Sequence, residues 1–254
     1  MATLAVGDVH GNLAALVDLL DQVRSECRQG DTVVFLGDYI DRGPDSKGCV
    51  DAILEFQTQV PAEVVYLLGN HEDWMLRTMH DNRRHSWLLG MDALATIESY
   101  SNEAALTIGE ALSRAGAKVF LEHCALPYEA FFDHVPADHL RFFESLALYH
   151  RTTDCVCTHG GVDPRVARIE DQGRFELIWG AGDFPDGYQG KEILVYGHRN
   201  DAAVDDAGWP APRIVGCTIG IDTISHGVLS AIRLPDRRLF QSARHEAFVS
   251  TTRR

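Results

Sequence analysis

The chain has 254 residues, of which 45% are hydrophobic and 24% are charged, as is usual for a soluble globular protein. Its formal net charge of -14 at pH 7 argues against binding to nucleic acid or to an anionic membrane, because both need a basic surface. No apolar run approaches the roughly 18 residues of a membrane span, and no basic leader precedes Gly7-Asp8, so we expect a cytoplasmic protein whose cysteines are reduced.

The first 68 residues alternate predicted strands and helices. A strand at 3–6 is followed by a helix from Leu13 to about Cys27, for which Asn12 is a suitable N-cap. The apolar runs 32–36 and 64–68 predict two further strands, with a second helix at 46–57 between them. Strands joined by helices in this way are typically parallel, so the pattern predicts an α/β fold.

The character of the chain changes from residue 73 to about residue 150. Helical patterning at 105–115 and 139–148 predicts a mostly helical insertion within a single domain of residues 1–254. The six histidines of this insertion have no metal-ligand spacing, and we interpret them as surface or partly buried side chains.

Strands return after the insertion. We predict strands at 154–158 and 191–196, and the short runs 213–218, 227–234 and 238–241 are typical of an antiparallel meander. Cys155 and Cys157 alternate within one apolar strand, and this pattern is more typical of small core residues than of metal ligands.

Five of the predicted strands are followed by polar side chains of the kind that bind metals. They are Asp8 with His10, then Asp38, Asn70, His159 and His198. The carboxyl ends of parallel strands meet at one edge of a sheet, where α/β proteins bind their ligands. Mixed Asp, Asn and His ligands suit manganese, iron or zinc, and the absence of thiolates argues against a structural zinc site. The pattern predicts two metal ions bridged by Asp38, which would generate a hydroxide near neutral pH.

These loops resemble the motifs of a known family. The stretches 7–11, 37–43, 69–72 and 159–161, with the later Gly197-His198, are similar to those of the calcineurin-like metallophosphoesterases. The forms Asp-Arg-Gly at 41–43 and His-Gly-Gly at 159–161 resemble the phosphoprotein phosphatase branch, whose bacterial members include serine/threonine phosphatases and symmetrical diadenosine tetraphosphate hydrolases. The resemblance implies a metallophosphoesterase-like β-sandwich of mixed sheets flanked by helices, with the helical insertion covering one side of the site.

The resemblance also implies which residues hold the metal ions. One ion would be bound by Asp8, His10 and Asp38. The other would be bound by Asp38, Asn70, His159 and His198. Manganese is the divalent metal that we expect, with iron and zinc as alternatives.

Three further residues take catalytic roles by the same resemblance. His71 would protonate the leaving oxygen, and Asp41 would orient His71 and raise its pKa. Arg42 would bind the phosphoryl oxygens, for which its planar fork is suited. We expect an extended chain at Asn70-His71, which would point the two side chains to opposite sides and turn His71 toward the substrate.

Two positions depart from the family pattern. Arg199 stands after Gly197-His198 where family members often have threonine. Trp179 is followed by Gly-Ala-Gly and not by the arginine that many bacterial relatives carry. We therefore hypothesise that Arg199, from the neighbouring loop, replaces this second phosphate-binding arginine.

The predicted activity is hydrolysis of phosphate monoesters, first of phosphoserine and phosphothreonine in proteins, by in-line attack of a hydroxide bridging two metal ions. A hydrolase of dinucleoside polyphosphates such as diadenosine tetraphosphate is the close alternative, because the same metal core serves both. The acidic balance and the lack of a basic, aromatic-interleaved stretch weigh against a nuclease or phosphodiesterase. A phosphopeptide-binding protein without activity would not need a general acid. The expected partners are phosphorylated proteins, small phosphate esters or nucleotides, and the sequence carries no signal for an oligomeric state.

Overall fold

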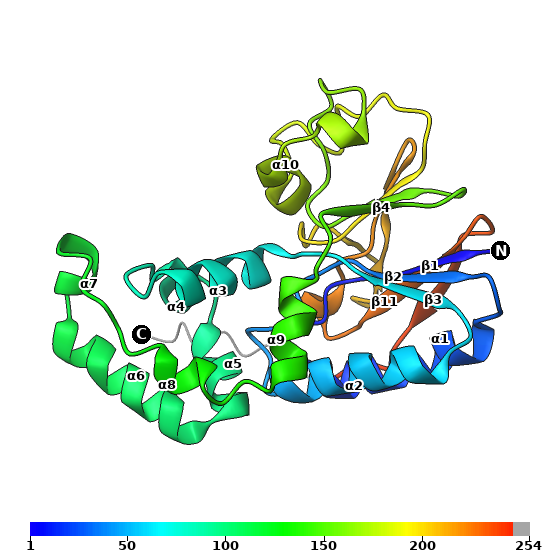
Figure 1. Ribbon diagram of the computed structural model, residues 1–254. Helices are drawn as coiled ribbons and strands as arrows, with labels where there is room; N and C mark the ends of the chain where they lie inside the picture. The colour runs from blue at the N-terminus through cyan, green and yellow to red at the C-terminus, as the bar shows by residue number, and fades with distance from the viewer. Residues whose placement is uncertain (246–254) are drawn as a thin grey trace.

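Short runs rich in β-branched and apolar residues form two five-stranded sheets in the computed structural model, which describes residues 1–245 (Figure 1). The first sheet has the order β12-β11-β1-β2-β3, in which β1, β2 and β3 are parallel while β11 and β12 run antiparallel to their neighbours. Its strands are β1 (Thr3–Val6), β2 (Thr32–Phe35), β3 (Glu63–Tyr66), β11 (Ser230–Leu234) and β12 (Arg238–Gln241).

The second sheet has the order β4-β5-β6-β10-β9, with three parallel strands in the middle and an antiparallel strand at each edge. Its strands are β4 (Tyr149–Arg151), β5 (Val156–Thr158), β6 (Leu194–Tyr196), β9 (Arg213–Val215) and β10 (Thr218–Gly220). A separate two-stranded sheet pairs β7 (Ala203–Val204) with β8 (Pro210–Ala211).

The two sheets pack face to face through a buried apolar layer. Alternation along each strand sends one set of side chains to this layer, for example Ala5 and Val34 from the first sheet and Cys157 and Val195 from the second. The opposite set of the first sheet packs against helices α1 (Leu13–Glu26) and α2 (Ser46–Gln59). Helix α10 (Arg174–Trp179) packs on the outer face of the second sheet. The prediction of a sandwich of mixed sheets flanked by helices is confirmed.

The helices of the first sheet begin where the sequence predicts. The Asn12 side chain accepts a hydrogen bond from the Ala15 N–H (3.1 Å) and caps α1. Asp45 caps α2 in the same way, accepting from the Gly48 N–H (2.7 Å). These caps fix the two loops that enter the helices, 7–12 and 37–45, at the carboxyl ends of β1 and β2.

Seven helices lie between β3 and β4 and form a lobe beside the sandwich (Figure 1). They are α3 (Asn70–His80), α4 (Ser86–Gly90), α5 (Ala93–Tyr100), α6 (Asn102–Ala115), α7 (Lys118–Leu121), α8 (Glu129–Phe132) and α9 (Ala137–Glu144). The helical segment therefore begins three residues before the predicted start at Asp73. Its last helix ends at Glu144 and not at the predicted 148, because Ala147 already exchanges backbone hydrogen bonds with Tyr66 and Leu68 at the end of β3.

The prediction of one antiparallel meander at the C-terminal end is wrong. Residues 213–218 are divided by a turn at Gly216 into β9 and the start of β10, and β10 pairs in parallel with β6 of the second sheet. The chain then crosses to the first sheet, where β11 and β12 form a separate hairpin. Short runs with turn residues between them look alike whichever sheet they join, so the crossing left no sequence signal. Among the described helices, none is long and apolar enough to cross a bilayer.

Candidate metal centre

Asp38 lies in the loop after β2, on backbone that turns sharply. Gly37 and Asp38 both adopt the left-handed region, with φ of +109° and +53°. The loop passes so close to the start of α3 that a Cβ atom on Gly69 would collide with the Asp38 carboxylate. This close approach buries Asp38 at the edge where both sheets end.

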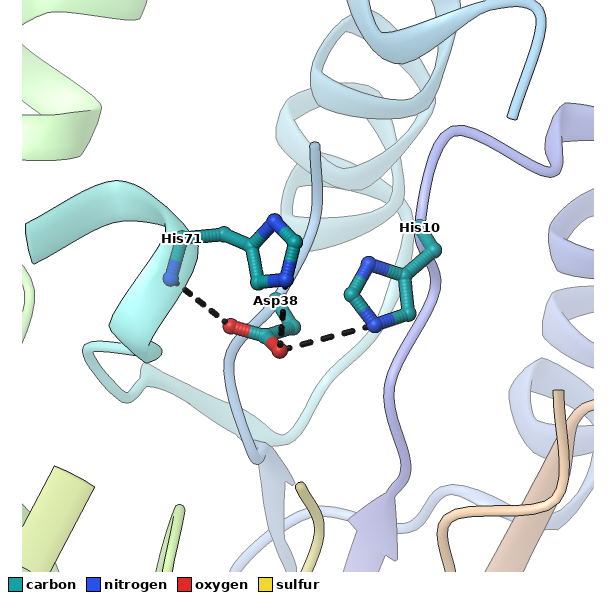
Figure 2. Close-up of side chains that lie close together, drawn as sticks. All are labelled: His10, Asp38 and His71. Atoms are coloured by element: carbon teal, nitrogen blue, oxygen red, sulfur yellow. Dashed lines mark hydrogen bonds and ion pairs between the residues drawn. The ribbon is translucent and has the colours of Figure 1, made fainter. Parts of the chain in front are cut away.

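The Asp38 carboxylate stands between two groups of histidines. Its Oδ2 is 3.5 Å from His10 Nε2 and 3.8 Å from His71 Nε2 (Figure 2). Its Oδ1 is 3.3 Å from His159 Nε2. Two sets have ligand atoms mutually within 4.8 Å, and they are His10, Asp38 and His71, and Asp38, His159 and His198. Asp38 belongs to both sets, as a bridging ligand must.

Two of these histidines have fixed tautomers. His10 Nδ1 is 3.1 Å from the Ile40 carbonyl oxygen, and His159 Nδ1 is 2.9 Å from the Leu36 carbonyl oxygen. Because a carbonyl only accepts, each Nδ1 carries a proton, and whenever the ring is neutral its Nε2 lone pair faces Asp38. Backbone carbonyls commonly orient metal-binding histidines in this way.

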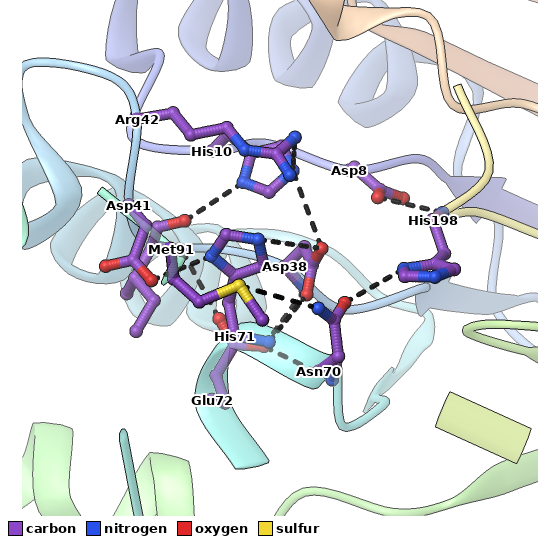
Figure 3. Close-up of polar contacts among 12 residues, drawn as sticks. Asp8, His10, Asp38, Asp41, Arg42, Asn70, His71, Glu72, Met91 and His198 are labelled. Carbon is purple, nitrogen blue, oxygen red and sulfur yellow. Dashed lines mark hydrogen bonds and ion pairs between the residues drawn. The ribbon is translucent and has the colours of Figure 1, made fainter. Parts of the chain in front are cut away.

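Asn70 and His198 complete the second set (Figure 3). The Asn70 side-chain oxygen is 2.9 Å from His198 Nδ1 and 3.0 Å from His159 Nε2. Rotation of the amide would instead turn its NH2 group toward these nitrogens and toward Asp38. Oxygen and nitrogen lone pairs thus converge on one buried point, an arrangement that a cation stabilises.

Asp8 lies on the His198 side of Asp38 (Figure 3). Its Oδ2 accepts a hydrogen bond from the His198 backbone N–H (2.9 Å), whereas its buried Oδ1 has no hydrogen-bond partner among residues 1–245. Burial raises the pKa of Asp8, and the nearby Asp222 raises it further. An unpartnered carboxylate oxygen beside converging lone pairs fits a metal ligand, so the residues present suit two divalent cations. The set of His10, Asp38 and His71, which is defined by distance, differs from the predicted ligands of the first ion in one residue. It contains His71 where the prediction has Asp8.

The carboxylates around His159 and His198 stabilise positive charge at this part of the centre. Burial lowers the pKa of His159, but Asp38 and Asp8 outweigh it and bring that pKa to about 10. Burial and the neighbouring His159 bring the pKa of His198 down to about 3. The acidic groups therefore stabilise one positive charge here, and a metal ion can supply it in place of a proton.

His71 and Asp41 form a buried pair on the other side of Asp38. His71 Nδ1 is 2.7 Å from Asp41 Oδ2, and its Nε2 has no hydrogen-bond partner in the described chain. Asp41 also accepts from Trp87 Nε1 (2.9 Å) and from the Thr96 hydroxyl (2.6 Å), both of which belong to the helical segment. Burial opposes protonation of His71, but Asp38 and Asp41 raise its pKa.

The prediction that an extended chain turns Asn70 and His71 to opposite sides is wrong. Asn70 and His71 lie in the first turn of α3 and not in an extended chain. Successive side chains of a helix point about 100° apart, which is enough to turn Asn70 to His159 and His198 and His71 to Asp41.

Glu72 is a residue whose role the sequence analysis missed. Its buried carboxylate accepts hydrogen bonds from the backbone N–H groups of Asp38 (3.0 Å), Tyr39 (2.8 Å) and Ile40 (3.3 Å). It therefore fixes the loop that carries Asp38. Glu72 belongs to the motif 69–72 that the sequence analysis identified. Its hydrogen bonds could not be inferred from the sequence, because the N–H groups that it accepts from lie more than 30 residues earlier in the chain.

Asp222 was missed for a different reason. It lies two residues after Gly220, the last residue of β10, and a search for carboxylates close to strand ends could have found it. Its Oδ2 accepts from the Asn200 N–H (2.7 Å) and so fixes the turn that follows His198.

The two arginines occupy different positions. Arg42 is exposed, and its Nη1 lies 2.9 Å from His10 Nε2, at the solvent side of the centre. Arg199 lies beside the loop after Trp179, with Nη1 3.5 Å from the Ala181 carbonyl oxygen and Nε 4.0 Å from Asp201. Among the described residues, the Arg199 guanidinium has no hydrogen bond or ion pair with Asp38. Its proposed role in phosphate binding therefore stays a prediction.

Comparison with known proteins gives one family. The model of the calcineurin-like phosphoesterases matches residues 1–227. A bis(5'-nucleosyl)-tetraphosphatase PrpE [asymmetrical] of Halalkalibacterium halodurans is 26% identical, over 96% of this chain and 95% of that protein. Serine/threonine-protein phosphatase 1 of Salmonella typhimurium is 36% identical, over 33% of this chain and 36% of that protein. The crystal structure of a putative diadenosine tetraphosphatase has the same fold, with a TM-score of 0.60 at 20% identity, over 94% of this chain and 92% of that one.

Proposed function

Because the chain belongs to the calcineurin-like phosphoesterase family, whose members hydrolyse phosphoric esters, we propose that it is a phosphatase working through the centre around Asp38. The observation that carries this proposal is the Asp38 carboxylate, which turns one oxygen to His10 and His71 and the other to His159. Two divalent cations bound there would activate a water molecule and neutralise charge on the phosphoryl oxygens.

The proposed ligands divide between the two sheets. Asp8, His10, Asp38 and Asn70 come from loops of the first sheet, and His159 and His198 come from loops of the second. We propose manganese as the metal, with iron and zinc as alternatives, because oxygen and imidazole ligands suit all three.

His71 is the proposed general acid. Its Nε2 faces Asp38 at 3.8 Å, so a proton there lies beside the space where a phosphoryl group would react. Asp41 holds the other nitrogen of the ring at 2.7 Å, which keeps Nε2 directed toward that space. The exposed guanidinium of Arg42 would bind the phosphoryl oxygens from the solvent side.

The helical segment belongs to the same catalytic domain in this proposal. Trp87 and Thr96 both donate hydrogen bonds to Asp41, so the orientation of the general acid depends on α4 and α5. We also propose that the enzyme works in the cytoplasm, because its six cysteines are free thiols.

Phosphoserine and phosphothreonine in proteins are the first proposed substrates, on the strength of the Asp-Arg-Gly and His-Gly-Gly motifs. Dinucleoside polyphosphates are the second. The alignment with the nucleosyl-tetraphosphatase favours them because it covers 95% of that protein, whereas the alignment with the serine/threonine phosphatase covers 36%.

The test is a substrate panel on protein stripped of metal and then reloaded with manganese. The panel contains para-nitrophenyl phosphate, its bis ester, a phosphothreonine peptide and diadenosine tetraphosphate. Hydrolysis of para-nitrophenyl phosphate that depends on manganese is expected, and either the peptide or the dinucleotide should be the better substrate. Failure to hydrolyse any of the four after full metal loading would overturn the proposal.

A further inference from the structure

A pocket of about 860 Å³ opens between α3, α4 and α7, in the helical segment that begins at the metal centre. Small-molecule sites commonly have volumes of about 300–1,000 Å³, so this pocket is large enough for a nucleotide. Trp74, Leu89, Val119 and Phe120 form an apolar wall.

The rest of the wall is basic. Arg77, Arg83 and Arg84 line the pocket, and Asp81 is its one lining carboxylate. Asp81 forms ion pairs with two of these arginines, at 3.0 Å from Arg83 and 3.7 Å from Arg84. Arg77 is in turn paired with Asp73 (2.8 Å), so three arginines face two carboxylates and leave a positive excess that complements an anionic ligand. Exposed guanidinium groups are suited to phosphate oxygens.

Phe120 gives the pocket a surface for a planar group. Phe120 is 67% exposed, so its ring is open to a ligand in the pocket. Aromatic rings bind nucleobases by stacking, and Trp74 offers a second ring in the same pocket. Arginines together with exposed rings match a ligand that joins phosphate groups to an aromatic base.

Helix α3 connects the pocket to the metal centre. It begins with Asn70 and His71, and it carries Trp74 and Arg77 one and two turns later. A rise of 1.5 Å per residue places Arg77 about 10 Å along the helix from Asn70. The Trp74 ring centroid is 5.1 Å from that of Trp179, which in turn is 5.5 Å from that of His198. The centre and the pocket are thus connected by α3 and by this row of rings, and a ligand that reached both would have to span at least about 10 Å, the distance between Asn70 and Arg77 along the helix.

We propose that the pocket of α3, α4 and α7 binds a nucleotide moiety, with its base against Phe120 and Trp74 and its phosphates on the arginines. One part of the inference rests on the proposed function, namely that the scissile phosphate of the same substrate lies at Asp38. A nucleotide site at this place favours dinucleoside polyphosphates, the second of the two proposed substrate classes, over phosphopeptides.

The test removes two arginines that are not needed for folding. The Arg83 and Arg84 side chains are 64% and 58% exposed, so the double variant R83A/R84A should fold. R114A is the matched control, because Arg114 is an exposed arginine of α6, in an ion pair with Glu110, that does not line the pocket. Binding of ADP is measured by calorimetry on protein treated with EDTA, and hydrolysis of para-nitrophenyl phosphate and diadenosine tetraphosphate is measured on manganese-loaded protein.

The double variant should bind ADP at least tenfold more weakly than the wild type, since hydrogen bonds to charged groups are lost, while R114A should bind it as the wild type does. The Michaelis constant for diadenosine tetraphosphate should rise by a similar factor, and hydrolysis of para-nitrophenyl phosphate should be unchanged. A second variant, F120A, should weaken binding of ADP but not of inorganic pyrophosphate, which has no base.

Equal ADP affinity in the wild type, the double variant and R114A would overturn the inference. Equal losses of ADP and pyrophosphate in F120A would also overturn it, because the site would then recognise phosphate alone. The proposed function fails separately, if manganese-loaded wild type hydrolyses none of the four substrates of the panel while the ADP results stand.

Discussion

Replacing Glu72 with glutamine is expected to weaken both the fold and the metal centre. Oε1 of Glu72 accepts from the N–H groups of Tyr39 and Ile40, and Oε2 accepts from those of Asp38 and Gly69. Glutamine keeps one oxygen and turns an NH2 group toward the other pair of donors. Two buried N–H groups then lose their acceptor.

The size of the effect follows from these contacts. Leaving a buried donor unsatisfied costs about 1–3 kcal/mol, so two such groups cost about 2–6 kcal/mol. Part of this is offset, because glutamine lacks the charge whose burial raises the pKa of Glu72 to about 7. We therefore expect the free energy of unfolding to fall by about 2 kcal/mol, which lowers the melting temperature by about 4–8 °C in a chain of this size. Displacement of the Asp38 loop should reduce manganese affinity about 10–100-fold, as is usual for residues that orient metal ligands.

Thermal unfolding followed by circular dichroism and calorimetric titration with manganese measure the two effects. Glu110→Gln is the matched control, since Glu110 is an exposed residue of α6 and its loss should change stability by less than about 0.5 kcal/mol. A Glu72→Gln protein that melts and binds manganese like the wild type would refute the role of Glu72 in holding the Asp38 loop.

Three further substitutions test the catalytic proposals. His71→Ala should lower kcat about 10²–10⁴-fold on a phosphothreonine peptide but far less on para-nitrophenyl phosphate, whose leaving group needs no proton; equal losses on both would contradict general acid catalysis. Trp87→Phe keeps the buried ring but removes the 2.9 Å hydrogen bond to Asp41, so kcat should fall about tenfold, and an unchanged kcat would show that Asp41 does not need this donor. Arg199→Ala should raise the Michaelis constant about tenfold in steady-state assays if Arg199 binds phosphate, and an unchanged value would discard that idea.

The side chains proposed as ligands could be expected to lie together because each stands within four residues of the end of a strand. Asp38 and His159 were found from local patterns of apolar run, glycine and ligand, and the parallel pairing of the strands brings such loops to one edge. The contacts that orient them could not be found in this way. Trp87 lies 46 residues after Asp41 and reaches it from a helix whose packing depends on the whole helical segment.

The parts of the fold that were wrong depended on tertiary context. The sequence 69–72 suits an extended turn as well as a helix start, and in the structure Glu72 both caps α3 through the Gly69 N–H (3.2 Å) and holds the Asp38 loop. The strands near the C-terminal end are short, and hydrogen bonding to β6 decides that β10 joins the second sheet. Neither partner is close in sequence.

The division of the proposed ligands between the two sheets has a thermodynamic consequence. His159 and His198 follow strands of one sheet, and Asp38 and Asn70 follow strands of the other, so a metal ion that binds all four binds only the docked pair of sheets. Such a ligand stabilises the native state by about 2.7 kcal/mol at a concentration 100 times its dissociation constant. By the same linkage, a substitution that loosens the apolar layer between the sheets, as at Val34 or Val195, should weaken metal affinity although neither side chain touches the metal. The bound metal would then act as a reversible crosslink between the two sheets, and the free energy of unfolding would increase with the metal concentration.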